Sequence, residues 1–171
     1  MYKITKRKKL ANQIYLMDIE APRVAASCKP GQFVIVKLDE VGERIPLTIC
    51  DYDREAETIT IVFQVVGAST ERMSHLYDDD AFEDVVGPLG CYSEWIDEDI
   101  EDLKKKKMLF VAGGVGTAPV YPQVKWLHEH GIDADVVIGA KTEELLILEE
   151  EMKAVAGRLY VCTDDGSYGT P

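Results

Sequence analysis

The spacing of hydrophobic and polar residues divides the chain into two parts. Across residues 2 to 86, short apolar or alternating runs are separated by polar turns, which favours an antiparallel β-barrel. The segments 39–43 and 53–57 are typical of hairpin connections. This part is predicted to contain strands at 14–17, 32–38, 47–50 and 58–66 and a short helix at 71–77.

From residue 108 onwards, apolar runs alternate with segments of helical periodicity. The pattern predicts strands at 108–112, 134–140 and 158–162, separated by helices at 117–130 and 142–156. Such alternation indicates right-handed βαβ crossovers and a parallel sheet. We therefore expect an N-terminal barrel domain over residues 1–100 and an α/β domain over 101–171.

Three strands are fewer than the roughly five or six of a complete α/β dinucleotide-binding domain. A partner could complete the sheet, but the strand count favours the chain being a fragment of a longer protein. The predicted fold class is an antiparallel β-barrel followed by a partial Rossmann-like parallel sheet.

Charge and hydropathy exclude some classes of function. The chain has 31 acidic and 19 basic residues, giving a formal charge of −12, which argues against binding nucleic acid or an anionic membrane surface. No apolar run approaches the roughly 18 residues that a membrane-spanning helix needs, and the N-terminus lacks a signal-peptide core. The expected location is the cytoplasm.

Metal chemistry has little support in the sequence. The four cysteines are widely spaced and form no Cys-x-x-Cys pair, and the three histidines lack the spacing of a metal site. We expect no metal ligands and four unreactive or buried thiols.

The first functional signal is a glycine-rich turn between a predicted strand and a predicted helix. Gly113, Gly114 and Gly116 precede Thr117 and Pro119, and such a turn lets a pyrophosphate approach the helix N-terminus. The general G-x-G-x-x-G fingerprint is not met, because Pro119 stands at its third glycine. A tight turn without a ligand is the alternative.

A second signal lies in the barrel pattern. Arg44 offers a two-pronged donor for a pyrophosphate, Pro46 fixes the backbone, and Thr48 offers a hydroxyl to a ring edge. Alternatively, this segment is an ordinary strand with one ion-paired arginine. Further on, Gly67, Ser69 and Thr70 form either a second anion-binding turn or a simple helix N-cap.

Six segments together resemble the ferredoxin–NADP reductase-like flavoproteins along the whole chain. Within this family they are similar to the flavin subunit of NADH-dependent ferredoxin–NADP oxidoreductases and to the electron-transfer subunit of dihydroorotate dehydrogenases. The segments are Pro30-Gly31-Gln32-Phe33, Arg44-Ile45-Pro46-Leu47-Thr48, Val66-Gly67-Ala68-Ser69-Thr70, Gly87-Pro88-Leu89-Gly90, residues 112–119 and Asp164-Asp165-Gly166-Ser167-Tyr168-Gly169.

The resemblance implies two cofactors and the residues that hold them. FAD would contact Arg44, Pro46, Leu47, Thr48, Phe63, Gln64, Val65, Gly67, Ser69 and Thr70. NAD(P)H would contact Gly113, Gly114, Gly116, Thr117, Pro119, Asp165 and Gly166. Thr48 is the candidate catalytic residue. Arg44 precedes it by four positions rather than the family's usual three, which leaves the flavin contact of Arg44 open.

The implied activity is hydride transfer between NAD(P)H and FAD, followed by electron transfer to an iron–sulfur partner. That partner is a larger catalytic or electron-accepting subunit, or a ferredoxin. Relatives also carry C-terminal cysteines for a [2Fe–2S] cluster, which would belong only to a longer parent chain. The alternatives are a dihydroorotate dehydrogenase electron-transfer subunit and a flavin-binding assembly or regulatory subunit without catalysis.

Overall fold

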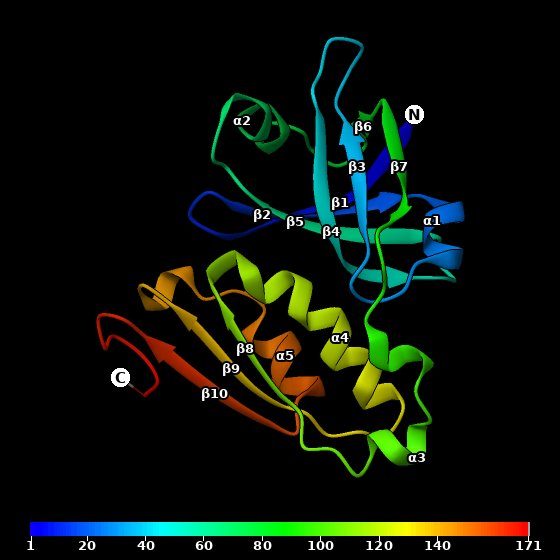
Figure 1. Ribbon diagram of the computed structural model, residues 1–171. Helices are drawn as coiled ribbons and strands as arrows, with labels where there is room; N and C mark the ends of the chain where they lie inside the picture. Colours follow the sequence, from blue (N-terminus) through cyan, green and yellow to red (C-terminus); the bar gives the residue numbers. More distant parts are fainter. Residues whose placement is uncertain (171) are drawn as a thin grey trace.

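The structure is a computed structural model that describes residues 1–170, in which ten strands form two sheets (Figure 1). The strands are β1 (Tyr2–Ala11), β2 (Ile14–Glu20), β3 (Phe33–Lys37), β4 (Arg44–Asp53), β5 (Thr58–Gln64), β6 (Ala81–Phe82), β7 (Asp84–Leu89), β8 (Leu109–Gly113), β9 (Asp135–Ala140) and β10 (Arg158–Thr163). The helices are α1 (Pro22–Ser27), α2 (Ala68–Ser74), α3 (Ile100–Leu103), α4 (Thr117–Glu129) and α5 (Glu149–Val155), with 3₁₀ turns η1 (Glu94–Asp97), η2 (Gly114–Gly116) and η3 (Glu143–Leu145).

The first sheet is antiparallel and curls into a barrel. Its seven strands follow the order β6-β1-β2-β5-β4-β3-β7. Inward side chains from both halves of the sheet form one core, to which α1 contributes Val24 and Ala25 and α2 contributes Met73. The second sheet has three parallel strands in the order β10-β9-β8. The predicted fold class, a barrel followed by a partial Rossmann-like sheet, is confirmed.

Helix α1 was not predicted, and its end is stabilised from a distant part of the chain. Pro22 stands at its first turn, where a missing N–H is tolerated. At the other end, the Arg54 guanidinium donates to the carbonyls of Ala25 and Cys28 at 2.9 and 3.2 Å, and also to that of Ala26. These bonds satisfy the last carbonyls of the helix, which otherwise lack partners. Such a long-range cap leaves no local signal.

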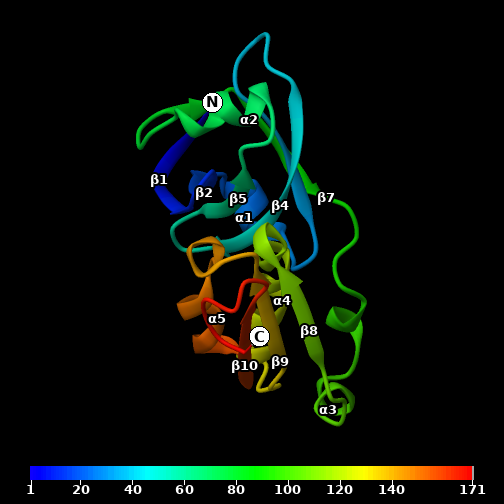
Figure 2. The same ribbon diagram turned by 90° about the vertical axis from the view of Figure 1, so that its left-hand side faces the viewer.

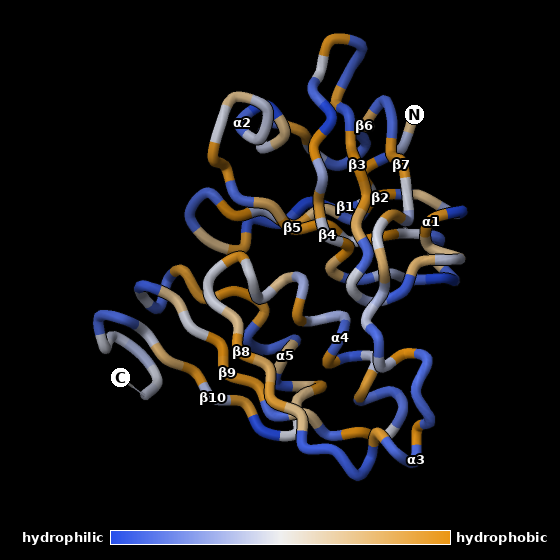
Figure 3. The backbone as a smooth tube through the Cα atoms, viewed as in Figure 1, coloured by the Kyte–Doolittle hydropathy of each residue, from blue (hydrophilic) through white to orange (hydrophobic). Residues whose placement is uncertain are grey.

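Helices α4 and α5 pack on the same face of the parallel sheet. Val124 of α4 and Met152 of α5 share a buried cluster with Val136 and Ile138 of β9. Figure 3 shows hydrophobic positions along all three strands. On the opposite face, the exposed apolar side chains are Leu109, Val111 and Tyr160.

The barrel and the α/β part share an apolar core, which we call the interface core. The barrel contributes side chains from the outer face of its sheet, and the second part contributes the start of α4 and the segment before α5. Its buried members are Ala11, Ile14, Leu16, Cys50, Val62, Ala118, Ile147 and Leu148. Figure 2 shows α4 and the segment before α5 directly below the barrel. The two parts therefore pack as one folded body.

The prediction for the last helix is wrong at its start. Instead of a continuous helix over 142–156, the chain forms η3, then an extended stretch, and only then α5 at Glu149. Ile147 and Leu148 are buried in the interface core, and Leu148 adopts a left-handed backbone with φ of 58°. Tertiary packing therefore overrides local helix propensity here. Helix α2 also begins three residues before the predicted 71–77.

The connecting segment packs on the second part. Trp95 and Ile100 contact a cluster formed by Leu103, Leu127 and Ile132. The lysine run that follows is solvated and ion-paired: Lys104 contacts Glu101 and Lys105 contacts Asp102, each at 2.7 Å. The division into domains 1–100 and 101–171 stays a prediction. None of the helices within residues 1–170 combines the length and hydropathy that crossing a bilayer requires.

The structure predicts a sharp difference in thiol reactivity. Burial raises the pKa of Cys28 to about 11 and also raises the pKa of Cys50, whereas Cys91 is exposed. Because the thiolate is the reactive form, a disulfide reagent at pH 8 should modify Cys91 rapidly and Cys28 and Cys50 only after denaturation. Mass spectrometry of the modified peptides measures this order. Fast modification of Cys50 in the folded chain would contradict the packing of the interface core.

Candidate functional site

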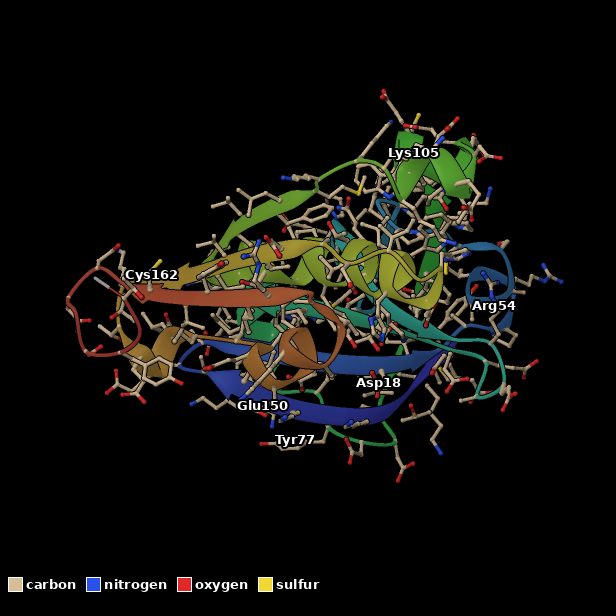
Figure 4. The ribbon with its side chains drawn as sticks, turned by 90° about the horizontal axis from the view of Figure 1, so that it is seen from below. Asp18, Arg54, Tyr77, Lys105, Glu150 and Cys162 are labelled. Atoms are coloured by element: carbon tan, nitrogen blue, oxygen red, sulfur yellow. The ribbon has the colours of Figure 1, made fainter. Side chains whose placement is uncertain are left out.

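A cleft of about 590 Å³ lies at the carboxyl ends of the parallel strands. Open parallel sheets bind ligands at this edge. The cleft is lined by Ile14, Gln64, Val111, Ala112, Gly113, Gly114, Val115, Val137, Gly139, Ala140, Lys141, Leu145, Cys162 and Asp164. In Figure 4, Cys162 lies at the arrowhead of β10, which marks this edge of the sheet. The glycine-rich turn and the ends of two barrel strands, β2 and β5, therefore meet at a single cleft.

The glycines of this turn have space around them. An added Cβ at Gly113 or Gly116 would meet no atom within 4 Å. Their φ values of −125° and −63° suit any residue. By contrast, an added Cβ at Gly157 would lie 2.9 Å from the Cβ of Asp133. The fold therefore demands glycine at 157 but not at 113 or 116, where the open space suits a closely approaching ligand.

Between these two positions, the backbone turns sharply into α4. Gly114 has φ of +54°, in the left-handed region, and α4 begins three residues later at Thr117. Thr117 is buried, and Pro119 lies in the first turn of the 13-residue helix, which has no acidic residue there. Free N–H groups and the helix dipole favour an anion at this end. The residues fit the pyrophosphate of a dinucleotide.

Gln64 links the two predicted residue sets. It is the last residue of β5 and is exposed, and it lines the cleft together with Gly113 and Gly114. The prediction from resemblance placed Gln64 with the flavin and the glycines with the nicotinamide. The structure brings Gln64, Gly113 and Gly114 to the same cleft, whereas Gly116, Thr117 and Pro119 lie outside its lining.

The central flavin candidates follow one another along β4. Arg44 is half-exposed and its guanidinium contacts the Asp84 carboxylate at 3.0 Å, which is the ion pair that the alternative interpretation foresaw. Pro46 is exposed, and Leu47 and Thr48 are partly buried. Thr48 is paired with Phe33 of β3, and its hydroxyl has no hydrogen-bond partner among residues 1–170. That hydroxyl remains free for a ligand.

Two further candidates are already engaged in the barrel. Phe63 is 2% exposed and stacks on Tyr15, with ring centroids 5.8 Å apart. The Val65 amide donates to the carbonyl of Gln13 at 2.8 Å. Neither the Phe63 ring nor the Val65 N–H is therefore free for a ligand.

The start of α2 has the geometry of a cap. The hydroxyl of Thr70 accepts from the amides of Val66 and Gly67 at 2.9 and 3.1 Å. Ser69 donates to the carboxylate of Glu43 in the hairpin between β3 and β4. At Gly67, an added Cβ would meet nothing within 4 Å. This turn thus combines the predicted cap with an open approach.

Asp165 and Gly166 belong to a separate turn beyond β10. The amide and hydroxyl of Ser167 donate to the Asp165 carboxylate at 3.0 and 2.7 Å, and they hold the pKa of Asp165 below its usual range. Gly166 adopts φ of +68°. The neighbouring Asp164, rather than either of these, lines the cleft.

Sequence reasoning missed several lining residues. Asp164 and Cys162 come at or just after the end of β10, and Lys141 comes just after β9. Their signal was positional, since each predicted parallel strand ends at this edge. Among residues 1–170, no three or more His, Cys, Asp or Glu side chains are arranged to hold a metal.

Comparisons with known proteins agree with this architecture. The chain is 63% identical over 168 residues to an uncharacterized protein in the adh 3′ region of Clostridium beijerinckii, covering 98% of this chain and 57% of that protein. It is 42% identical over 166 residues to a Thermotoga maritima homologue of the electron transfer subunit of dihydroorotate dehydrogenase B (NAD(+)), covering 97% and 56%. The chain thus spans little more than half the length of these relatives. No protein-family model matches the sequence.

A solved structure shows the same two-part arrangement. It is that of an NADH-dependent reduced ferredoxin–NADP oxidoreductase, which superimposes with a TM-score of 0.87 at 38% identity over 99% of this chain and 59% of that chain. Sequence relatives and a solved structure therefore agree with the six motifs and the barrel-plus-sheet fold. Over nearly its whole length the chain is therefore similar to proteins of the ferredoxin–NADP reductase-like type, as the six motifs predict.

Proposed function

We propose that the barrel binds FAD, that the cleft binds NADH, and that the chain passes a hydride from NADH to FAD. The electrons then continue to an iron–sulfur partner. The observation that carries this proposal is the open space at Gly113 and Gly114 beside Gln64 of the barrel. A dinucleotide held at the glycine turn would extend toward the barrel strand that ends at Gln64.

The barrel residues fit a flavin dinucleotide. Half of the Arg44 side chain remains exposed beside Asp84, so its remaining N–H groups suit a pyrophosphate oxygen. The turn at Gly67 admits a close backbone approach. The partnerless hydroxyl of Thr48 suits hydrogen bonding to a flavin ring edge.

The cleft fits the unphosphorylated nicotinamide cofactor better than the phosphorylated one. Lys141 is its one lining cation and Asp164 its one lining acid among the described residues, and Glu143 follows Lys141 closely. A 2′-phosphate would meet no excess of positive charge here. We therefore propose NADH as the reductant, in line with the names of the relatives.

The protein's contribution is binding and orientation. Bound FAD would accept a hydride equivalent and release electrons one at a time, which is chemistry that the cofactor supplies. The glycine turn and the N-terminus of α4 hold the anionic part of the dinucleotide in place. Thr48 fixes the orientation of the ring edge and supplies a hydrogen bond to it. Apolar side chains such as Val111 and Val137 supply the apolar part of the lining.

The electron acceptor is proposed from the relatives. The matched proteins are nearly twice as long, and one is named as a ferredoxin–NADP oxidoreductase. We propose a larger iron–sulfur-containing subunit or a ferredoxin as the partner, and we assign the [2Fe–2S] cluster to a longer parent chain. No partner follows from the cleft itself.

A second candidate rests on the names of several relatives. The protein from Fusobacterium nucleatum, called a dihydroorotate dehydrogenase B electron transfer subunit, is 32% identical over 165 residues. In that role, the same flavin would exchange electrons with a dihydroorotate-oxidising subunit. The acceptor distinguishes the two candidates, whereas reduction by NADH is common to both.

The first test is an absorption spectrum. The purified chain should retain FAD after desalting, and anaerobic NADH should bleach the visible absorption of the flavin. Flavin that is retained but stays oxidised would contradict hydride transfer and favour a non-catalytic flavin-binding subunit. Failure to retain FAD would contradict flavin binding by this chain.

The role of Thr48 is tested by removing only its hydroxyl. Thr48→Val should slow flavin reduction at saturating NADH about 10-fold, since it removes one hydrogen bond at the reacting ring edge. Thr48→Ser, the matched control, should stay within about 3-fold of the wild type. Stopped-flow absorbance measures both rates. Equal rates for the valine and serine variants would rule out the hydroxyl.

Alanine substitutions at Gly116 and Gly157 should affect different properties, one the affinity for NADH and the other the stability of the fold. Gly116→Ala should leave the melting temperature unchanged and weaken NADH binding about 10-fold, or about 1.4 kcal/mol. Gly157→Ala should lower the melting temperature and leave the NADH affinity unchanged, because its Cβ would collide with Asp133. Calorimetry measures the affinities and circular dichroism the melting curves. Unchanged NADH affinity in Gly116→Ala would contradict the assignment of the turn.

A further inference from the structure

Strand β4 contains a bulge that changes the direction of its side chains. Ile49 is paired with Ile61, but Asp51 is paired with Thr60, so β4 has one extra residue at Cys50. Ile49 faces the barrel core and Cys50 faces the interface core. Regular alternation would turn Asp51 back toward the barrel core. The bulge instead leaves it on the outer face, beside Cys50.

On that face Asp51 meets helix α4. Its Oδ1 atom accepts from the Nζ atom of Lys125 at 2.7 Å and from the amide of Tyr52 at 2.8 Å. The two side chains are 27% and 30% exposed. The backbone bond fixes the Asp51 carboxylate independently of Lys125. Asp51, which the bulge places on the outer face of the barrel, thus links the barrel to helix α4.

The charge state of the pair is stable around neutral pH. Burial lowers the pKa of Lys125, but the hydrogen bond to Asp51 and its negative charge outweigh burial, so the pKa lies above its usual value. Lys125 therefore stays protonated throughout the physiological range.

The pair connects the two elements that carry the candidate cofactor sites. Asp51 lies three positions after Thr48 on β4, and Lys125 lies eight positions, or roughly 12 Å, after Thr117 on α4. Near the start of α4, Ala118 and Tyr121 already contact the interface core. The ion pair adds a directional polar contact one to two turns further along the helix, where Gln123 also accepts a hydrogen bond from Ser93 at 3.0 Å.

The ion pair contributes less to stability than the apolar side chains around it, so its role differs from that of the interface core. A partly exposed ion pair contributes little to the free energy of folding, whereas each buried aliphatic side chain of the interface core contributes several times more. The apolar residues therefore supply the adhesion between the two parts. The ion pair adds direction, because a 2.7 Å hydrogen bond fails when its partners move by about 1 Å.

We propose that Asp51 and Lys125 are positioning residues for hydride transfer. Together with the bulge at Cys50, they set the angle of α4, and thereby place the glycine turn relative to the flavin side of the barrel. The inference rests on the proposed function. Neither residue lines the cleft or belongs to the proposed cofactor contacts, so losing the pair should lower the rate of hydride transfer without weakening the binding of FAD.

The kinetic test compares two ion pairs of equal length. Lys125→Met should lower the rate of flavin reduction at saturating NADH about 10-fold while the Kd for FAD stays within about 2-fold. Asp51→Asn should act alike, and Lys125→Arg should retain the rate because it restores the cation. Lys105→Met is the matched control, since Lys105 and Asp102 also pair at 2.7 Å but lie away from the interface. Circular dichroism establishes that each variant folds.

A distance measurement tests the geometry without depending on activity. Spin labels at Glu55→Cys in the barrel and Lys153→Cys in α5 report the arrangement of the two parts, in a chain carrying Cys91→Ser and Cys162→Ser. We expect one narrow distance distribution, which broadens in Lys125→Met but not in Lys105→Met.

The outcomes are distinct. A lower rate together with a broadened distribution supports the proposal. An unchanged rate, or a lower rate with an unchanged distribution, overturns it. If NADH does not reduce the flavin of the wild-type chain, the proposed function fails and the role in hydride transfer fails with it. The distance distribution then still decides whether the ion pair fixes the two parts.

Discussion

The interface core is the constraint on which the rest of the structure depends. Strands β2 and β5 bury both faces: Ile61 points into the barrel, and Val62 points into the interface core. A barrel with such an outer face leaves apolar surface in water unless a second element covers it. Helix α4 and the segment at Ile147 provide that cover. The barrel and the α/β part thus stabilise each other, and their arrangement is a product of folding.

This arrangement also makes the cleft. With the first turn of α4 against the barrel, the glycine turn that precedes it lies beside the end of β5, where Gln64 and Ile14 complete the lining. A rotation of α4 about the contact that Ala118 makes with the interface core would move the glycine turn away from the end of β5. Geometry at the cleft therefore depends on residues far from it, which is common where two elements must place two ligands.

Sequence patterns predicted what local signals encode. The glycine turn, the strand–helix alternation and the barrel were predicted because periodicity and turn residues mark them. Features decided by distant contacts were missed or misplaced. Helix α1 depends on a cap from Arg54, and the start of α5 depends on burial of Leu148. The contact between Asp51 and Lys125 depends on a one-residue bulge, which no alternation pattern reveals.

The glycines show how a structure adds to a sequence motif. In the sequence, Gly116 and Gly157 look alike, since each lies next to a predicted element boundary. The structure separates them, because a side chain at 157 would collide with Asp133 whereas one at 116 would enter open space. Packing inside the protein therefore explains the glycine at 157, whereas it gives no reason for the glycine at 116. Where the residue type at a position is not explained by packing or backbone conformation, we expect a functional reason for it. The glycine turn at the cleft is such a position.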